Sequence, residues 1–95
     1  MSLWALSISP KAQKDIASLD KEIAGRILEK LEWLEENINS IAPQRLSANL
    51  AHSYKLRVGD YRIVYDLNRR FSIIYVDKVE HRSKIYRKWN TSKSF

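Results

Sequence analysis

The most regular hydrophobic pattern in the chain lies between residues 54 and 65. Apolar and cationic side chains alternate there on both sides of Gly59-Asp60, a dipeptide typical of two-residue turns. We therefore predict a β-hairpin in which Arg57 lies opposite Arg62. Alternation places the apolar side chains on one face and three cations on the other, namely Lys55, Arg57 and Arg62. Like charges in register disfavour folding, which indicates that this face binds a polyanion.

The N-terminal half predicts a strand followed by two helices. Residues 3–8 alternate as a strand does, and Ser9-Pro10 is typical of a helix start. We expect this first helix to end near Leu19 and Asp20 to cap a second helix over residues 21–37, which carries apolar residues at spacings of three and four. Trp4 and Trp33 are expected to pack between the helices and the sheet.

The C-terminal half predicts mainly strands. Residues 39–53 show little periodicity and are expected to form a loop, whereas residues 71–79 are apolar on both faces, as an interior strand is. Residues 83–89 are expected to form a short helix or an irregular tail. The predicted class is α+β, with an N-terminal strand, a helical hairpin, a three-stranded antiparallel meander (β-α-α-β-β-β) and a short C-terminal segment.

Composition narrows the functional classes. The chain has 95 residues, 44% of them hydrophobic, which suits one globular domain over residues 1–95. It contains no cysteine, which excludes disulfides, thiolate zinc sites and cysteine nucleophiles. The sequence shows neither a signal peptide nor a membrane span, so we expect a cytoplasmic protein that makes no membrane contact.

The charge is unevenly distributed along the chain. Residues 1–51 carry six Lys/Arg and seven Asp/Glu, whereas residues 52–95 carry eleven and four, a net charge of +7. A basic half of this kind is the electrostatic footprint of a protein that binds nucleic acid or an acidic protein. The alternative is a basic surface that only keeps the protein in solution.

The usual metal and cofactor motifs are missing from the sequence. His52 and His81 lie far apart, and neither has a second histidine four residues away, as a metal site on a helix would have. Gly25 and Gly59 are the only glycines, so no glycine-rich phosphate loop can form. We therefore expect no metal and no cofactor.

The cationic hairpin face has the chemistry needed to bind RNA and to cleave it. Arginine grips phosphate with two donors, and aromatic rings stack on unpaired bases. In metal-independent cleavage a ribose 2′-hydroxyl attacks the adjacent phosphate, a base takes its proton, arginines stabilise the charge and an acid protonates the leaving 5′-oxygen. Lysine, histidine and tyrosine are the candidates for the two proton transfers.

Two segments resemble the RelE/ParE toxin superfamily. Residues 56–65, Leu-Arg-Val-Gly-Asp-Tyr-Arg-Ile-Val-Tyr, are similar to its central hairpin, and residues 81–87, His-Arg-Ser-Lys-Ile-Tyr-Arg, to its C-terminal signature. Ser-Pro-Lys-Ala at residues 9–12 and the Leu/Ile-rich second helix also match. The resemblance implies a small toxin of a bacterial or archaeal toxin–antitoxin pair, held inactive in a hetero-oligomer by a cognate acidic antitoxin.

For the RelE branch, the resemblance implies cleavage of mRNA in the ribosomal A site, with the ribosome and mRNA as partners. Lys55 would be the base or a phosphate ligand, Arg62 would stabilise the phosphate, and Tyr86 would stack on a base or donate a proton. The candidate catalytic residues are then Lys55, Arg62, His81, Arg82 and Tyr86, and the candidate RNA-binding residues are Arg57, Lys84 and Arg87.

The chain departs from this pattern at two positions. Well-studied relatives carry a lysine where this chain has Ser53 and an arginine where it has Glu80. The loss of these charges implies a slower reaction, or one in which His81 shares the proton transfer. The ParE branch has the same fold but inhibits DNA gyrase without a nuclease site. The arginine-rich hairpin and the C-terminal motif favour the RelE branch.

Overall fold

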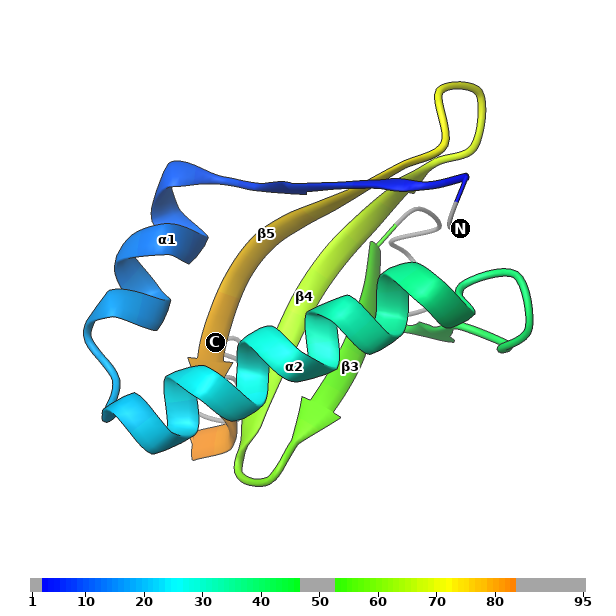
Figure 1. Ribbon diagram of the computed structural model, residues 1–95. Helices are drawn as coiled ribbons and strands as arrows, with labels where there is room; N and C mark the ends of the chain where they lie inside the picture. The colour runs from blue at the N-terminus through cyan, green and yellow to red at the C-terminus, as the bar shows by residue number, and fades with distance from the viewer. Residues whose placement is uncertain (1–2, 47–52, 84–95) are drawn as a thin grey trace, which may run out of the picture.

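The computed structural model describes residues 3–46 and 53–83. The elements follow in the order β1 (Ala5–Ile8), α1 (Pro10–Ala17), α2 (Lys21–Asn37), β2 (Gln44–Arg45), β3 (Ser53–Val58), β4 (Tyr61–Asn68) and β5 (Ile73–His81) (Figure 1). The α+β class, the helical hairpin and the antiparallel meander are confirmed. No helix among the described residues is long and apolar enough to cross a membrane.

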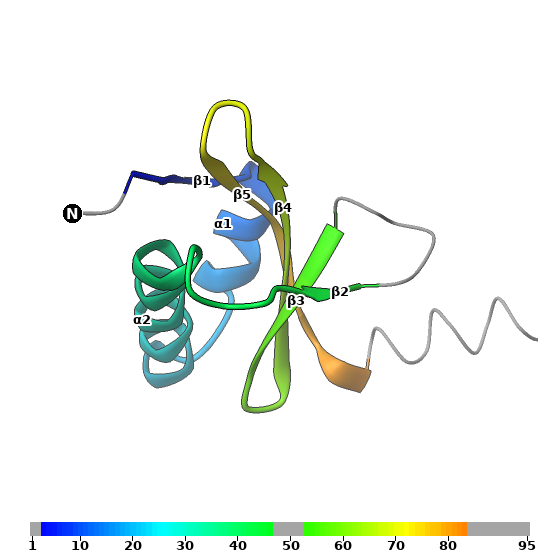
Figure 2. The same cartoon turned by 90° about the vertical axis from the view of Figure 1, so that its right-hand side faces the viewer.

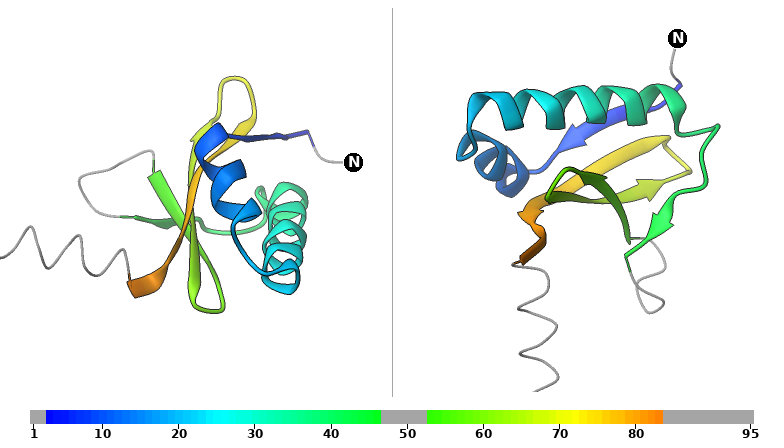
Figure 3. Two further views of the ribbon diagram at one scale, coloured as in Figure 1. Left: turned by 90° about the vertical axis from the view of Figure 1, so that its left-hand side faces the viewer. Right: turned by 90° about the horizontal axis from the view of Figure 1, so that it is seen from below.

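The strands form one mixed sheet in the order β1-β5-β4-β3-β2. β1 runs parallel to β5, and the other neighbouring pairs are antiparallel. Both helices lie on the same side of the sheet (Figure 2 and Figure 3), and α2 passes in front of β5, β4 and β3 (Figure 1). We call this side the helix-covered face and the opposite side the outer face. The core fills the space between helices and sheet; its fully buried members include Ile27, Leu31 and Leu34 of α2 and Ile63, Tyr65, Ile74 and Val76 of the sheet.

The two helix starts differ in how they are capped. The Ser9 hydroxyl accepts a hydrogen bond from the Ala12 amide (3.0 Å), and Pro10 occupies the first helical position, as predicted. α1 then ends two residues before Leu19. Asp20 holds the cap position of α2, as predicted, although its side chain makes no capping hydrogen bond.

Two further expectations are corrected by the structure. Trp4 is buried and its indole N–H donates to Asn39 Oδ1 (3.0 Å), but Trp33 is 38% exposed. Trp33 lies about 100° around the helix from buried Leu34, off the stripe that meets the sheet. Residues 39–53, expected to be a loop, contain β2, whose Gln44 pairs with Lys55. A two-residue strand is too short to leave a periodic pattern.

A β-bulge interrupts the pairing of β5 with β4. Val64 lies opposite Lys78, whereas Tyr65 lies opposite Val76, so Asp77 is the extra residue on β5. An extra residue reverses the alternation of side chains beyond it.

The bulge decides which side chains of β5 reach the outer face. Val79 packs in the core, as Val76 does before the bulge, and this turns Lys78 and Glu80 toward the outer face. α1 supports this arrangement from the helix-covered side. The Val79 amide donates to Asp15 Oδ2 (3.0 Å), and the Ser9 hydroxyl donates to the Asp77 carbonyl (2.6 Å). The N-terminal helix therefore helps to set the composition of the outer face.

Candidate functional site

The three hairpin cations meet on the outer face in the predicted register. Arg57 lies opposite Arg62, and Lys55 lies opposite Val64. A hollow of about 190 Å³ is lined by Gln44, Lys55, Arg57 and Arg62, and we call it the cationic hollow. The hydrogen-bonded strands β3 and β4 hold the three cations, and β2 adds the Gln44 amide as a neutral donor. A phosphate placed there would meet donors from three strands.

A carboxylate lies beside this array. Glu80 of β5 is the cross-strand partner of Arg62, and only 8% of it is exposed. Its Oε1 lies 3.5 Å from the Lys78 ammonium. Arg62 therefore has a cation opposite it on β3 and an anion opposite it on β5. Glu80 offsets part of the repulsion between Arg57 and Arg62 and reduces the positive charge available to a ligand.

His81 does not join the cationic hollow. It pairs in register with Tyr61, and their rings meet edge to face with centroids 5.2 Å apart, on the helix-covered face. Its Nδ1 accepts a hydrogen bond from the Ser83 amide (3.2 Å) and lies 2.9 Å from the Ser83 hydroxyl. This pattern places the proton of the neutral ring on Nε2. The sheet thus separates His81 from Arg62.

Arg82 lies at the turn end of the hairpin. Its amide donates to the Asp60 carbonyl (2.8 Å), and its guanidinium is 3.9 Å from the Asp60 carboxylate. Both side chains are more than half exposed, so this ion pair leaves Arg82 available to a ligand. The remaining candidates, Lys84, Tyr86 and Arg87, lie outside the described residues.

The two departures from the family pattern have different surroundings. Ser53 donates a hydrogen bond to Asp66 Oδ1 (2.8 Å) on the outer face. Glu80 takes part in the row of Arg57 and Arg62 described above. Both changes place polar groups without positive charge close to the cations, so the cationic hollow depends on fewer charges than the family pattern implies.

Tyr65 belongs to the core and lies away from the cationic hollow. Only 1% of it is exposed, and its ring stacks on Tyr54 with centroids 5.6 Å apart. Burial, helped by the neighbouring Tyr54, raises the pKa of Tyr65 to about 12. Its hydroxyl stays neutral at physiological pH, which suits a structural role. Among residues 3–46 and 53–83, no cluster of His, Asp and Glu could hold a metal ion.

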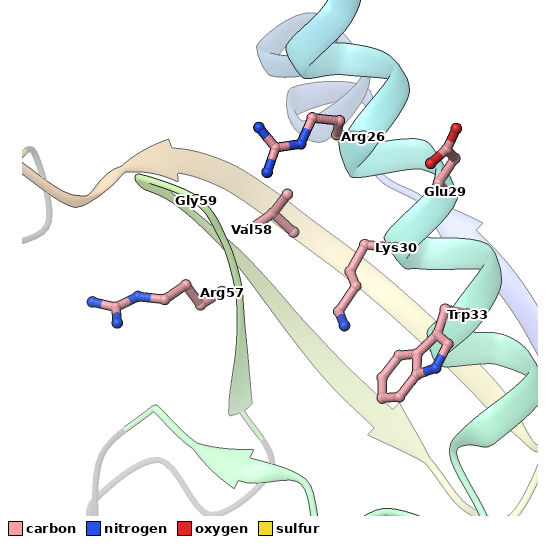
Figure 4. Close-up of a pocket in the computed structure, with 7 residues that line it drawn as sticks. All are labelled: Arg26, Glu29, Lys30, Trp33, Arg57, Val58 and Gly59. Atoms are coloured by element: carbon pink, nitrogen blue, oxygen red, sulfur yellow. The ribbon is translucent and has the colours of Figure 1, made fainter.

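A second hollow, of about 410 Å³, lies between α2 and β3 (Figure 4). On the side of this hollow that α2 forms, the Lys30 ammonium lies 4.0 Å from the centroid of the Trp33 ring. Arg57 borders this hollow too, but Figure 4 shows its guanidinium pointing away from α2. Arg57 therefore belongs to the cationic hollow, whereas the cations of the second hollow are Arg26 and Lys30.

Sequence reasoning missed Gln44, Lys78 and the role of Glu80 in this site. Gln44 was hidden in a segment without periodicity, and β2 is too short to be recognised. Lys78 and Glu80 reach the outer face only because of the bulge at Asp77. The one usable signal was the pair of charges at positions 78 and 80 after an apolar run, which indicates a solvent-facing strand end.

Comparison with known proteins identifies the family. The model of the ParE toxin of the type II toxin-antitoxin system parDE matches residues 6–86. A search among curated proteins found no match.

Similar solved structures share the fold along most of their length. The RelBE2 toxin–antitoxin complex of Mycobacterium tuberculosis is 21% identical with a TM-score of 0.73, over 83% of this chain and 98% of that one. The isolated RelE toxin of Escherichia coli is 20% identical with a TM-score of 0.70, over 94% and 97%. The RelB–RelE antitoxin–toxin complex of Methanococcus jannaschii is 26% identical with a TM-score of 0.67, over 84% and 94%.

The family match extends from β1 to the C-terminal motif, and the matched structures share the fold over more than four fifths of this chain. The chain therefore belongs to the ParE toxin family of type II toxin–antitoxin systems, within the RelE/ParE superfamily.

Proposed function

We propose that this toxin is a ribosome-dependent endoribonuclease that cleaves mRNA in the cytoplasm and so inhibits translation. The observation that carries the proposal is the convergence of Lys55, Arg57 and Arg62 with Gln44 in one hollow. Cations held by hydrogen-bonded strands are preorganised for a phosphate, which lowers the cost of binding it and of stabilising charge that develops on it. The similar fold of the RelE toxins is consistent with this reaction.

In the proposed reaction the ribose 2′-hydroxyl attacks the adjacent phosphorus and the 5′-oxygen leaves. Arg62 and Arg57 bind the phosphate oxygens and stabilise the extra negative charge of the transition state. Lys55 takes the proton of the 2′-hydroxyl or binds the phosphate. Tyr86, whose role rests on the family resemblance, protonates the leaving oxygen or stacks on a base. His81 faces away from this array, so we assign it no part in proton transfer.

The proposed regulatory partner is an antitoxin encoded beside the toxin. The matched structures from M. tuberculosis and M. jannaschii are toxin–antitoxin complexes. The net charge of +6 favours an acidic partner, which would also compete with RNA for the cationic hollow. We expect toxin and antitoxin to form a hetero-oligomer in which the toxin is inactive.

The test adds the purified toxin to a translating cell extract with a defined mRNA and maps new 5′ ends by primer extension. Arg62→Ala should abolish cleavage, and Arg62→Lys should restore only part of it because lysine lacks the two-pronged geometry of arginine. Arg70→Ala is the matched control, since Arg70 is exposed and stacks over the Phe71 ring. Full cleavage by a folded Arg62→Ala protein would refute the assignment.

A second candidate function is inhibition of DNA gyrase without nuclease activity. The observation that favours it is the match of the ParE toxin model to residues 6–86. This function predicts intact mRNA in the translating extract and a loss of supercoiling when gyrase is incubated with the toxin. Measuring both readouts on one protein preparation separates the two functions.

A further inference from the structure

Another hollow on the outer face lies beyond the cationic hollow, toward the turn that joins β4 to β5. It has a volume of about 900 Å³, and we call it the Tyr75 hollow. Tyr75 lies opposite Asp66, and Ser7 of β1 lies on the other side of Tyr75, so one row crosses three strands. The side chains that line it include Tyr75, Asp66, Asn68, Arg45 and Arg69.

These side chains suit one nucleotide of a single strand. Tyr75 is 39% exposed in this hollow, where its ring can stack on a base. The Asp66 carboxylate accepts one hydrogen bond from Ser53 and would repel a phosphate, but it accepts hydrogen bonds from the amino group of a base. Arg69 is exposed and also lines the hollow, and it supplies a phosphate contact. The base therefore lies over Tyr75 and the backbone runs past Arg69.

The Tyr75 hollow and the cationic hollow share one face and one strand. Asp66 and Arg62 are four residues apart on β4 and project from the same face, a distance of roughly 13 Å along the strand. The row between them contains Lys55 and Lys78 on either side of Val64, so cations also lie between the two hollows. A single RNA strand of a few nucleotides can reach both hollows.

We propose that the Tyr75 hollow binds a base of the same single-stranded RNA, a few nucleotides away from the phosphate held at Arg62. This inference rests on the proposed function for its substrate, and it adds a base-binding subsite beside the cationic hollow, whose own side chains contact the phosphate. Stacking on Tyr75 would hold the strand in place, and Asp66 would favour a base that carries an amino group, such as cytosine over uracil.

The test measures binding of a fluorescent, single-stranded 2′-O-methyl oligoribonucleotide, which lacks the attacking hydroxyl and cannot be cleaved. Tyr75→Leu should weaken binding about 5- to 150-fold, the range expected for one lost stacking contact. Tyr75→Phe keeps the ring and should bind like the wild type. An abasic oligonucleotide with the same phosphates should bind Tyr75→Leu and the wild type equally. Oligocytidine should bind more tightly than oligouridine, and Asp66→Asn should remove this preference.

Equal binding of the base-bearing oligonucleotide by Tyr75→Leu and the wild type would overturn the inference. Unchanged RNA binding with weaker antitoxin binding by Tyr75→Leu would also overturn it and would assign the hollow to a protein partner. The proposed function is tested separately by cleavage in the translating extract. Tyr75-dependent binding without cleavage would reject the nuclease and keep the RNA subsite, whereas normal cleavage with Tyr75-independent binding would reject the subsite alone.

Discussion

The opposed arginines of the hairpin predict a trade-off between stability and function. Arg57 is exposed and lies directly opposite Arg62. At a separation of roughly 8 Å and an effective dielectric constant of roughly 40–80, two such charges repel by about 0.5–1 kcal/mol. Arg57→Gln removes this repulsion and keeps much of the aliphatic stem. We therefore expect the free energy of unfolding to rise by about 0.5 kcal/mol at low salt, within the range for cross-strand charge pairs.

The salt dependence of this gain identifies its cause. The Debye length falls from about 30 Å at 0.01 M to about 3 Å at 1 M salt, so the gain should disappear at high salt. In the same variant RNA cleavage should slow about tenfold or more, because a charge-assisted hydrogen bond to phosphate is worth roughly 1.5–3 kcal/mol.

The assay is urea unfolding of the wild type and Arg57→Gln at the two salt concentrations, with cleavage measured in parallel. Arg70→Gln is the control, because it removes an exposed arginine from the turn between β4 and β5. A loss of stability in Arg57→Gln, or a gain that salt does not alter, would refute the reasoning.

Three further predictions concern the scaffold. Burial raises the pKa of Tyr65 from its ordinary value of 10.0 to about 12, so the folded state keeps a proton that the unfolded state releases as pH rises. Between about pH 9 and pH 11.5, the free energy of unfolding of the wild type should fall by about 2 kcal/mol more than that of Tyr65→Phe. Equal losses for the two proteins in urea unfolding would contradict this. Gly25→Ala should stabilise the protein by about 1 kcal/mol, because a Cβ at this helical position meets no atom within 4 Å. Thermal unfolding measures this gain, and a loss of stability would contradict the prediction. Asp15→Ala should lower the free energy of unfolding by about 1–3 kcal/mol, because it leaves the Val79 amide unpaired. Hydrogen exchange at Val79 should become faster in this variant. Lys11→Ala, which removes only the partner of Asp15 in an exposed ion pair, should change neither quantity.

The hairpin register was predictable because two local signals agree. Alternation along β3 and β4 fixes which side chains share a face, and Gly59, at φ 58°, provides the left-handed residue that a two-residue turn needs. The positions of Lys55, Arg57 and Arg62 follow from that register alone. The cationic hollow was therefore visible in the sequence, apart from Gln44.

The sequence could not predict which side chains at the end of β5 face outward. A strand that is apolar on both faces has no alternation from which to assign its residues to one face or the other. The bulge at Asp77 is set by contacts with α1, more than sixty residues away in the chain. It sets the phase of the residues that follow, so that Glu80 lies beside Arg62 on the outer face and His81 lies beside Tyr61 on the helix-covered face. The motif at residues 81–87 indicated the family but could not show this separation.

If the outer face promotes attack of a ribose 2′-hydroxyl on mRNA, the chemical groups at the ends of the RNA fragments will record that reaction. We would isolate the fragments formed in the translating extract and analyse their termini by mass spectrometry. We expect 2′,3′-cyclic phosphates, or the 3′-phosphates they hydrolyse to, paired with 5′-hydroxyl ends. Fragments with 5′-phosphate and 3′-hydroxyl ends would contradict this expectation, as would intact message in the presence of a folded toxin that blocks gyrase supercoiling.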